Sequence, residues 1–367
     1  MFVPDPEQYA TARNAAGIAA LGRRTLFEVR GPDAAELLQG QLTNDIAALS
    51  PGDGCYALLL THKARIRADM RVLCFDGGGG GRYFVLESEP QAAPVLRHML
   101  THAAVGLNVA WHDLSEQREL WMVVGPRTNE ALAASPPSEV EHSVRVVAGA
   151  WLVRTYLGVD LFVPNGESPN SLLSSALPTL ERDVIECLRI EHGRPRLGIE
   201  LGSTTMPAEA GVVERAVSFT KGCYVGQEPV ARLHYRGRAN RLLRGLRLAS
   251  AVATGAPVRH QGREVGRVGS CAHSPRFGVI ALALLRREIE PGTRVAVDSP
   301  GAGAAPATDS TAEAPSADAA AAASATVTAE VSTLPFDSPG ASTAALAGGQ
   351  GDDRQRPQGA CAQRPPG

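Results

Sequence analysis

Apolar and polar residues follow two different periods along this chain, and the changes of period place the predicted strands and helices. Alternating or continuous apolar runs predict strands at residues 25–30, 55–60, 66–75, 83–86, 108–113 and 118–124, and a hairpin at 144–157. Apolar residues spaced three and four apart, or clusters of helix formers, predict helices at residues 9–20, 34–38, 91–102, 127–134, 169–176, 179–191 and 227–235. Asp33 is expected to cap the helix at 34–38 with its carboxylate. This grouping indicates an α+β protein.

Two C-terminal segments differ from the rest in composition. Between residues 242 and 297, short strands separated by glycines predict a small barrel or sandwich. From Ser299 to Gly367 the chain consists mainly of Ala, Gly, Pro, Ser and Thr. Such a segment buries too little apolar surface to offset its chain entropy, so residues 299–367 are predicted to be a disordered tail.

Length, charge and cysteine usage exclude several classes of protein. The 367 residues suffice for two or three compact units, and a formal net charge of -2 argues against direct nucleic-acid binding. No apolar run approaches the roughly 20 residues of a membrane span, and the first residues show no signal core. The six cysteines include no C-x-x-C pair, which favours a reducing cytoplasm and predicts neither disulfides nor a metal site.

The segment 219–232, FTKGCYVGQEPVAR, carries the densest chemistry. Cys223 follows Lys221 by two residues, lies between Gly222 and Gly226, and precedes the helix predicted at 227–235. The two glycines favour a turn with positive φ, and a helix N-terminus beside an amine lowers the pKa of a thiol below roughly 8.5. The alternative is a small buried cysteine in a tight turn. We favour an exposed, functional thiol because lysine occurs only at positions 63 and 221.

Other polar groups suggest ligand contacts, each with a plainer alternative. Arg65, Arg67 and Asp69 occupy alternate positions on one strand face, which either is solvated or faces an anionic ligand. The polar run 39–45 ends a predicted helix as a capped turn or as a ligand contact. A carboxylate at Glu191, just before a glycine stop, can accept two hydrogen bonds from an amino-heterocycle, or it is simply exposed. The glycine run 77–81 lacks G-K-[ST], so we expect a hairpin connection.

Three motifs resemble one known family. They are GPD at 31–33 with LQGQLTND at 38–45, RIEHG at 189–193, and KGCYVGQE at 221–228. Together they resemble the YgfZ-type folate-binding proteins, relatives of the glycine-cleavage T-protein, the aminomethyltransferase, over residues 9–297. The resemblance implies a three-part clover-leaf: residues 1–50 with 145–238 as a discontinuous folate-binding domain, 51–144 as a ferredoxin-like α+β domain, and 239–298 as a C-terminal β-barrel.

The resemblance also implies a function. It predicts a tetrahydrofolate-binding accessory protein that serves iron-sulfur enzymes or their assembly proteins, including enzymes that modify tRNA, with the thiol at the mouth of the folate pocket. The resemblance implies that Cys223, Lys221 and Asp69 are the catalytic residues. The residues expected to hold tetrahydrofolate or a one-carbon derivative are Asn44, Asp45, Arg189, Glu191, Tyr224, Gln227, Glu228 and Arg232.

One departure from the T-protein pattern leaves open whether the chain is an enzyme. Where the T-protein has two adjacent carboxylates, this sequence has Ala68 and Asp69. Because aminomethyl transfer needs acid and base groups at the reacting nitrogen, losing one weakens that prediction. A folate-dependent aminomethyl or methyl transferase is therefore the alternative function.

Overall fold

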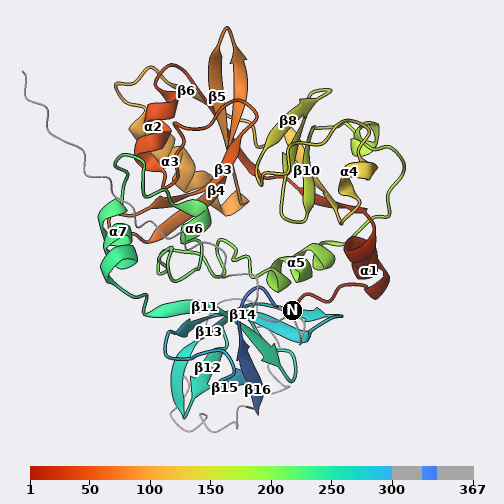
Figure 1. Ribbon diagram of the computed structural model, residues 1–367, viewed down its shortest axis with the longest axis vertical. Helices are drawn as coiled ribbons and strands as arrows, with labels where there is room; N and C mark the ends of the chain where they lie inside the picture. Colours follow the sequence, from red (N-terminus) through yellow and green to blue (C-terminus); the bar gives the residue numbers. More distant parts are fainter. Residues whose placement is uncertain (300–324, 337–367) are drawn as a thin grey trace, which may run out of the picture. The chain divides into compact units, whose positions relative to one another are not determined.

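Two five-stranded sheets and a closed six-stranded barrel carry the fold of this computed structural model within the residues it describes, 1–299 and 325–336 (Figure 1). All strand pairs within them are antiparallel. The first sheet has the order β1 (Gly17–Gly22), β7 (Arg118–Val124), β10 (Gly158–Pro164), β9 (Ala150–Arg154) and β8 (Val144–Val147). The second has the order β3 (Gly54–Leu60), β4 (Ile66–Gly78), β5 (Gly81–Ser88), β2 (Thr25–Arg30) and β6 (Ala110–Asp113).

The barrel takes its last strand from the segment predicted to be disordered. Its order is β11 (Arg241–Leu248), β14 (Gly278–Arg286), β13 (Arg263–Ser274), β12 (Pro257–His260), β15 (Arg294–Ser299) and β16 (Ala325–Ser332). In β16, Val327, Ala329 and Val331 alternate with polar residues and are buried in the barrel core. The prediction of disorder is therefore wrong for residues 325–336, while residues 300–324 and 337–367 of that tail lie outside the described residues.

The helices lie on the sheets and between the sheets and the barrel. They are α1 (Pro6–Asn14), α2 (Ala34–Gln41), α3 (Ala93–Ala103), α4 (Thr128–Ala131), α5 (Arg182–Glu191), α6 (Val213–Ala216) and α7 (Gln227–Arg236). Figure 1 shows α5 between the two sheets and the barrel, and its apolar side chains share one core with α1, β1 and barrel strands. Every residue of α5 from Val184 to Glu191 is buried. Polar residues of α5 thus face the interior. None of the helices in the described ranges is long and apolar enough to cross a membrane.

Two local features predicted within residues 9–38 are wrong. The first helix ends at Asn14 instead of Ala20, because Gly17–Gly22 pairs with β7 as a strand. The helix begins after Asp5, whose carboxylate accepts hydrogen bonds from the Glu7 and Gln8 amides. Asp33 makes no side-chain capping bond at α2, since its carboxylate accepts the Asn108 amide instead.

The predicted domain boundaries do not separate the two sheets. Strand β2 lies in the predicted first segment, 1–50, but pairs with β5 of the predicted middle domain. Strand β7 lies in that middle domain, 51–144, but pairs with β1 and β10 of the other sheet. The chain therefore crosses between the sheets at residues 22–25 and 113–118.

Candidate functional site

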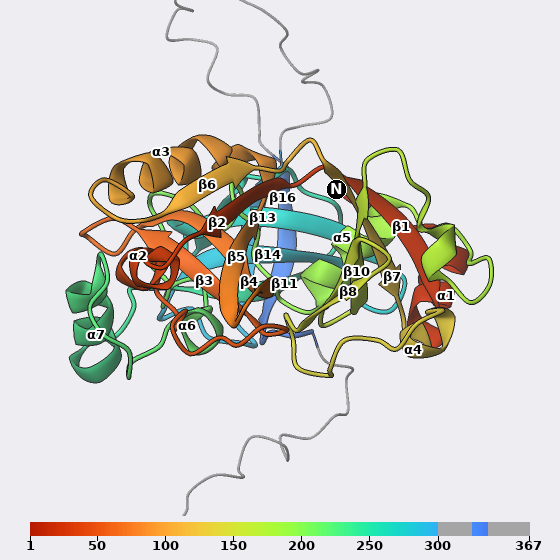
Figure 2. The same cartoon turned by 90° about the horizontal axis from the view of Figure 1, so that it is seen from above.

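The loop before α7 displays Cys223 at the surface. Cys223 is exposed, as predicted, and α7 begins at Gln227 with Gly226 as its N-cap. Gly226 has a φ of 86°, and a Cβ built on it would lie 2.5 Å from the carbonyl oxygen of Thr61. Gly222, in contrast, lacks positive φ and has no atom within 4 Å of such a Cβ. Of the two glycines predicted to shape the turn around the thiol, only Gly226 occupies a position that requires glycine. Figure 2 shows α7 beside α6 and at the opposite end from α1.

Gly226→Ala is expected to lower the free energy of unfolding by about 2 kcal/mol or more, because alanine is strained at this φ and its methyl group meets Thr61. Gly222→Ala is the matched control and should change it by less than about 0.5 kcal/mol. Urea unfolding of both variants measures the difference. Equal stability of the two variants would show that the loop does not need a left-handed residue.

Lys221 has a structural role that the sequence did not predict. Its ammonium group donates hydrogen bonds to the carbonyl oxygens of Gln39 at 2.6 Å, Leu42 at 2.6 Å and Asn44 at 2.9 Å. Burial lowers the pKa of Lys221 to about 8, so the amine is still protonated at neutral pH. An ammonium has three N–H donors, and all three are used by the backbone. Lys221 thus fixes the end of α2, with no donor left for the thiol of Cys223.

The other residues predicted from the same motifs lie in three kinds of surroundings: the turn that Lys221 fixes, the core of the second sheet, and helix α7. The Asn44 side chain donates to the carbonyl oxygens of Tyr56 and Arg215, and the Asp45 carboxylate accepts from Gln39. They therefore join Lys221 in one structural cluster. Tyr224 is buried in the core of the second sheet, Gln227 is half-buried, and Glu228 and Arg232 are exposed on α7. Whether any of them binds folate stays a prediction.

A cavity of about 220 Å³ lies between the two sheets, α5 and the segment that follows it. We call it the central cavity. Polar residues in its wall include Tyr56, Asp69, His142, Asp160, Arg189 and Arg194. They come from β3, β4, β10, α5 and two loops. Cys223 does not line the central cavity, so the structure does not bring the thiol and Asp69 into one site.

Asp69, a candidate catalytic residue of the sequence analysis, lines the central cavity. Its Oδ2 accepts a hydrogen bond of 2.8 Å from the Tyr56 hydroxyl, whereas its Oδ1 is buried without a partner. Burial raises the pKa of Asp69 to about 6, against the opposing effect of the Tyr56 hydrogen bond. Asp69 therefore gains or loses a proton close to neutral pH, as an acid/base group requires.

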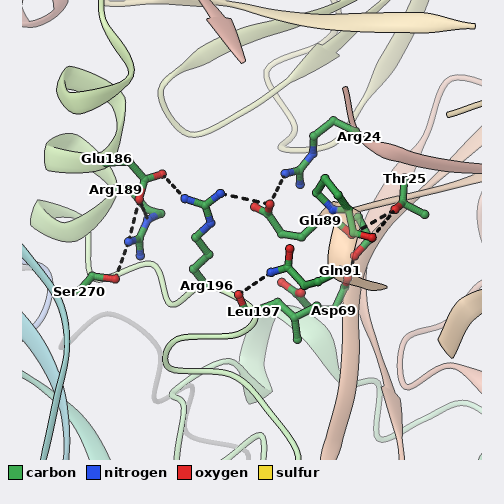
Figure 3. A network of polar contacts seen from close by, with 12 residues as sticks. Arg24, Thr25, Asp69, Glu89, Gln91, Glu186, Arg189, Arg196, Leu197 and Ser270 are labelled. Atoms are coloured by element: carbon green, nitrogen blue, oxygen red, sulfur yellow. Dashed lines mark hydrogen bonds and ion pairs between the residues drawn. The ribbon is translucent and has the colours of Figure 1, made fainter. Parts of the chain in front are cut away.

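Ion pairs bind the wall of the central cavity together (Figure 3). Arg196 reaches Glu89 at 3.2 Å and Glu186 of α5 at 3.0 Å, and Glu89 also pairs with Arg24 at 2.8 Å. Arg189 pairs with Glu186 and donates to the hydroxyl group of Ser270 in the barrel at 2.7 Å. The network thus connects α5 to both the second sheet and the barrel. Because these groups are largely buried, their geometry is fixed more firmly than that of surface pairs.

A second branch of the network crosses from one sheet to the other. Glu87, only 2% exposed, lies 2.6 Å from Arg24 and 2.7 Å from Arg71. Although burial alone would raise it, these two guanidinium groups hold the pKa of Glu87 at about 2. Arg71 on β4 in turn pairs with Asp160 on β10 at 2.7 Å. Glu87 is therefore shared by two largely buried guanidinium groups, each of which has a second carboxylate partner.

Unpaired polar atoms gather in the central cavity. Of the six buried side-chain nitrogen and oxygen atoms in the described residues that lack a hydrogen-bond partner, four line it: Asp69 Oδ1, His142 Nδ1, Asp160 Oδ1 and Arg194 Nη1. Leaving a buried polar group unpaired costs about 1–3 kcal/mol, so each such atom needs an explanation. A ligand or ordered water in this cavity would supply the missing partners.

Glu191 lies on the other side of α5. It is 3% exposed, and its Oε1 accepts hydrogen bonds from Tyr9 at 2.8 Å and Ser274 at 2.5 Å. Residues two apart on a helix point in roughly opposite directions, so Arg189 lines the central cavity and Glu191 does not. Glu191 instead joins α1 to the barrel. Its predicted contact with a pterin stays a prediction that this geometry does not support.

The comparisons with known proteins agree with this architecture. Residues 5–145 match the GCVT N-terminal domain, and residues 241–312 match the glycine cleavage T-protein C-terminal barrel domain. The chain is 30% identical over 329 residues to an aminomethyltransferase of Streptomyces coelicolor, which covers 81% of this chain and 86% of that protein. The chain belongs to the aminomethyltransferase family. The aminomethyltransferase of Bartonella henselae has the same fold, with a TM-score of 0.74 at 20% identity over 90% of this chain and 89% of that one.

The relatives of this chain include both aminomethyltransferases and an iron-sulfur cluster assembly factor. A Saccharopolyspora erythraea aminomethyltransferase is 28% identical, covering 82% of this chain and 87% of that protein. A Chaetomium globosum iron-sulfur cluster assembly factor, a mitochondrial IBA57 homolog, is 30% identical over 242 residues, covering 60% of this chain and 54% of that protein. The predicted fold class, a T-protein fold with a C-terminal barrel, is confirmed. Membership of the YgfZ-type branch stays a prediction.

Proposed function

We propose that the central cavity binds the pterin head of a tetrahydrofolate. The supporting observation is the set of four unpaired atoms: three acceptors, on Asp69, His142 and Asp160, and one donor, on Arg194. A ligand that pairs with all of them carries several N–H groups and one acceptor oxygen. The two-ring head of a reduced pterin has an amino group, ring N–H groups and one carbonyl. At about 220 Å³ the cavity is smaller than the roughly 300–1,000 Å³ of drug-sized pockets, so the folate tail would remain outside.

Bound tetrahydrofolate would supply a carrier for a one-carbon group, and the chain would supply Asp69 as an acid/base group beside it. The pKa of Asp69, about 6, lets this carboxylate hold or release a proton there. Ala68 is fully buried, and neighbouring residues of a strand face opposite sides. The chain thus presents a single acid/base group at the position where the T-protein pattern has a pair. This arrangement favours binding over aminomethyl transfer.

We further propose that the protein serves the assembly or repair of iron-sulfur enzymes, tRNA-modifying ones among them, from a cytoplasmic location. Two observations support the role in assembly or repair: the exposed thiol of Cys223, and a relative named as an iron-sulfur cluster assembly factor. Within residues 1–299 and 325–336, no three His, Cys, Asp or Glu side chains come together to hold a metal ion. Since clusters need about four ligands, Cys223 would contribute one and a client or assembly protein the others.

Cys223→Ser tests the two halves of the proposal separately. We expect unchanged affinity for tetrahydrofolate in calorimetry, because Cys223 does not line the central cavity. In a strain lacking the native gene, the variant should restore iron-sulfur enzyme activity about tenfold less well than the wild type. Cys55→Ser, which alters a half-buried thiol, is the control. If Cys223→Ser fully restores iron-sulfur enzyme activity, the thiol has no role in the mechanism. If the wild-type protein binds no tetrahydrofolate, the folate half of the proposal is wrong.

The second candidate is a tetrahydrofolate-dependent aminomethyl or methyl transferase. It is favoured by the aminomethyltransferases that match this chain over most of their length. Asp69 would be its acid/base group. The test measures turnover of a methylamine or dimethylglycine-type donor by the purified protein at saturating tetrahydrofolate. Turnover that Asp69→Asn abolishes would establish the transferase.

A further inference from the structure

His142 lies in the central cavity in a backbone conformation that few residues adopt. Its φ is 74°, in the left-handed region, although it is not a glycine. The segment is held from both sides: the His142 amide donates to the Arg154 carbonyl oxygen, and a side chain at Gly54 would collide with the His142 carbonyl oxygen. Strain of this kind persists only where the surrounding structure imposes it, and it concentrates at functional sites.

The position of the ring shows which of its atoms is available. The imidazole is 13% exposed, and its plane makes an angle of 29° with the Tyr56 ring, with 6.3 Å between ring centroids. Tyr56 is the residue that donates to Asp69. Burial, with Arg71 and Arg194 nearby, lowers the pKa of His142 to about 3, so the ring is neutral. With its proton on Nε2, 3.8 Å from the Glu141 carboxylate, the ring leaves Nδ1 as an unpaired acceptor.

We propose that His142 is a specificity-determining residue of the central cavity, whose Nδ1 accepts a hydrogen bond from a ring N–H or amino group of the bound pterin. This inference rests on the proposed function and adds a contact to it. His142 and Asp69 then hold the same ligand from two segments, the loop before β8 and strand β4. Tyr56 lies beside both side chains, since it donates to Asp69 and its ring centroid is 6.3 Å from that of His142.

The test compares two substitutions that differ in what they remove. His142→Gly relieves the backbone strain and deletes the acceptor, so we expect an unchanged or higher melting temperature and about tenfold weaker tetrahydrofolate binding. His142→Asn tolerates positive φ and keeps a side-chain acceptor, so we expect affinity within about threefold of wild type. Calorimetric titration with tetrahydrofolate and thermal unfolding measure both quantities.

A matched control separates strain from recognition. Gln261 also has a positive φ, 50°, but lies in the hairpin between β12 and β13 of the barrel. Gln261→Gly should raise stability in the same way and leave the affinity unchanged. Wild-type affinity in His142→Gly, or equal loss in His142→Gly and His142→Asn, would overturn the inference while the folate proposal stands. A wild-type protein that binds no reduced folate would overturn both.

Discussion

Asp69→Asn is expected to weaken tetrahydrofolate binding at pH 7 by about a hundredfold, which corresponds to losing a charge-assisted hydrogen bond of roughly 1.5–3 kcal/mol. The substitution keeps the size of the side chain and an oxygen that accepts from Tyr56. It removes the negative charge that the unpaired Oδ1 offers to a ligand N–H. Calorimetry with tetrahydrofolate measures the change, and Asp76→Asn, in the exposed glycine hairpin, is the control.

The same variant should be more stable than the wild type when no ligand is bound. Burial raises the pKa of Asp69 from 3.8 to about 6, so between these values the folded state binds more protons than the unfolded state. The contribution of Asp69 to stability is therefore full below pH 4 and lost as pH rises through 6. At pH 7, Asp69→Asn avoids this loss and should raise the free energy of unfolding by about 2 kcal/mol.

Two pH series check these signs. Wild-type affinity for tetrahydrofolate should fall as pH decreases from 7 to 5, because protonation removes the charge on Asp69, and the affinity of Asp69→Asn should stay flat. Urea unfolding should show the stability advantage of the variant shrinking over the same range. A variant that binds tetrahydrofolate as tightly as the wild type at pH 7 would exclude Asp69 from the site.

Glu87→Gln is expected to cost about 3–5 kcal/mol of unfolding free energy, the largest loss of stability that we predict. Glu87 is the carboxylate between Arg24 and Arg71, and its neutral replacement removes one of the two counter-charges of each largely buried guanidinium group, so that Arg24 keeps Glu89 alone and Arg71 keeps Asp160 alone. Because its pKa is about 2, the wild-type interaction persists across the ordinary pH range. Denaturant unfolding at pH 7 measures the loss.

An exposed ion pair provides the comparison. Glu116 pairs with Arg23 at the surface, where the Glu116 side chain is 77% exposed. Glu116→Gln should change the unfolding free energy by less than about 1 kcal/mol, as is usual for surface pairs. If both substitutions have similarly small effects, water reaches the Glu87 network and the wall of the central cavity is less rigid than its geometry indicates.

Local patterns predicted most individual elements because the signal for each lies within its own residues. The helix at Gln227–Arg236 and the strands β3, β4 and β5 follow directly from apolar periodicity and glycine positions. The prediction failed where composition was averaged over a long segment. Residues 325–332 alternate apolar and polar side chains, but the Ala- and Pro-rich sequence on both sides obscured a strand that needs β11 and β15 as partners.

The candidate site was predicted less well because its residues are distant in sequence. Asp69 was singled out from its strand position and from the T-protein pattern, whereas Tyr56, His142 and Asp160 belong to no motif and meet only when the two sheets pack. Lys221 and Glu191 are part of motifs, but the structure uses them to fix a turn and to join α1 to the barrel. A motif identifies residues that matter; it does not separate those that bind from those that position.

Strand β16 also determines the order in which the molecule can be completed. It fills the gap between β15 and β11, and shortly after it the Phe336 amide donates to the carbonyl oxygen of Glu191 at the end of α5. During synthesis on the ribosome, the edges of β11 and β15 and the Glu191 carbonyl oxygen therefore lack these partners until residues 325–336 have emerged. The helix that carries Arg189 into the cavity wall obtains this contact only after Phe336 has been synthesised, so completion of the barrel and of the cavity wall depends on the same segment.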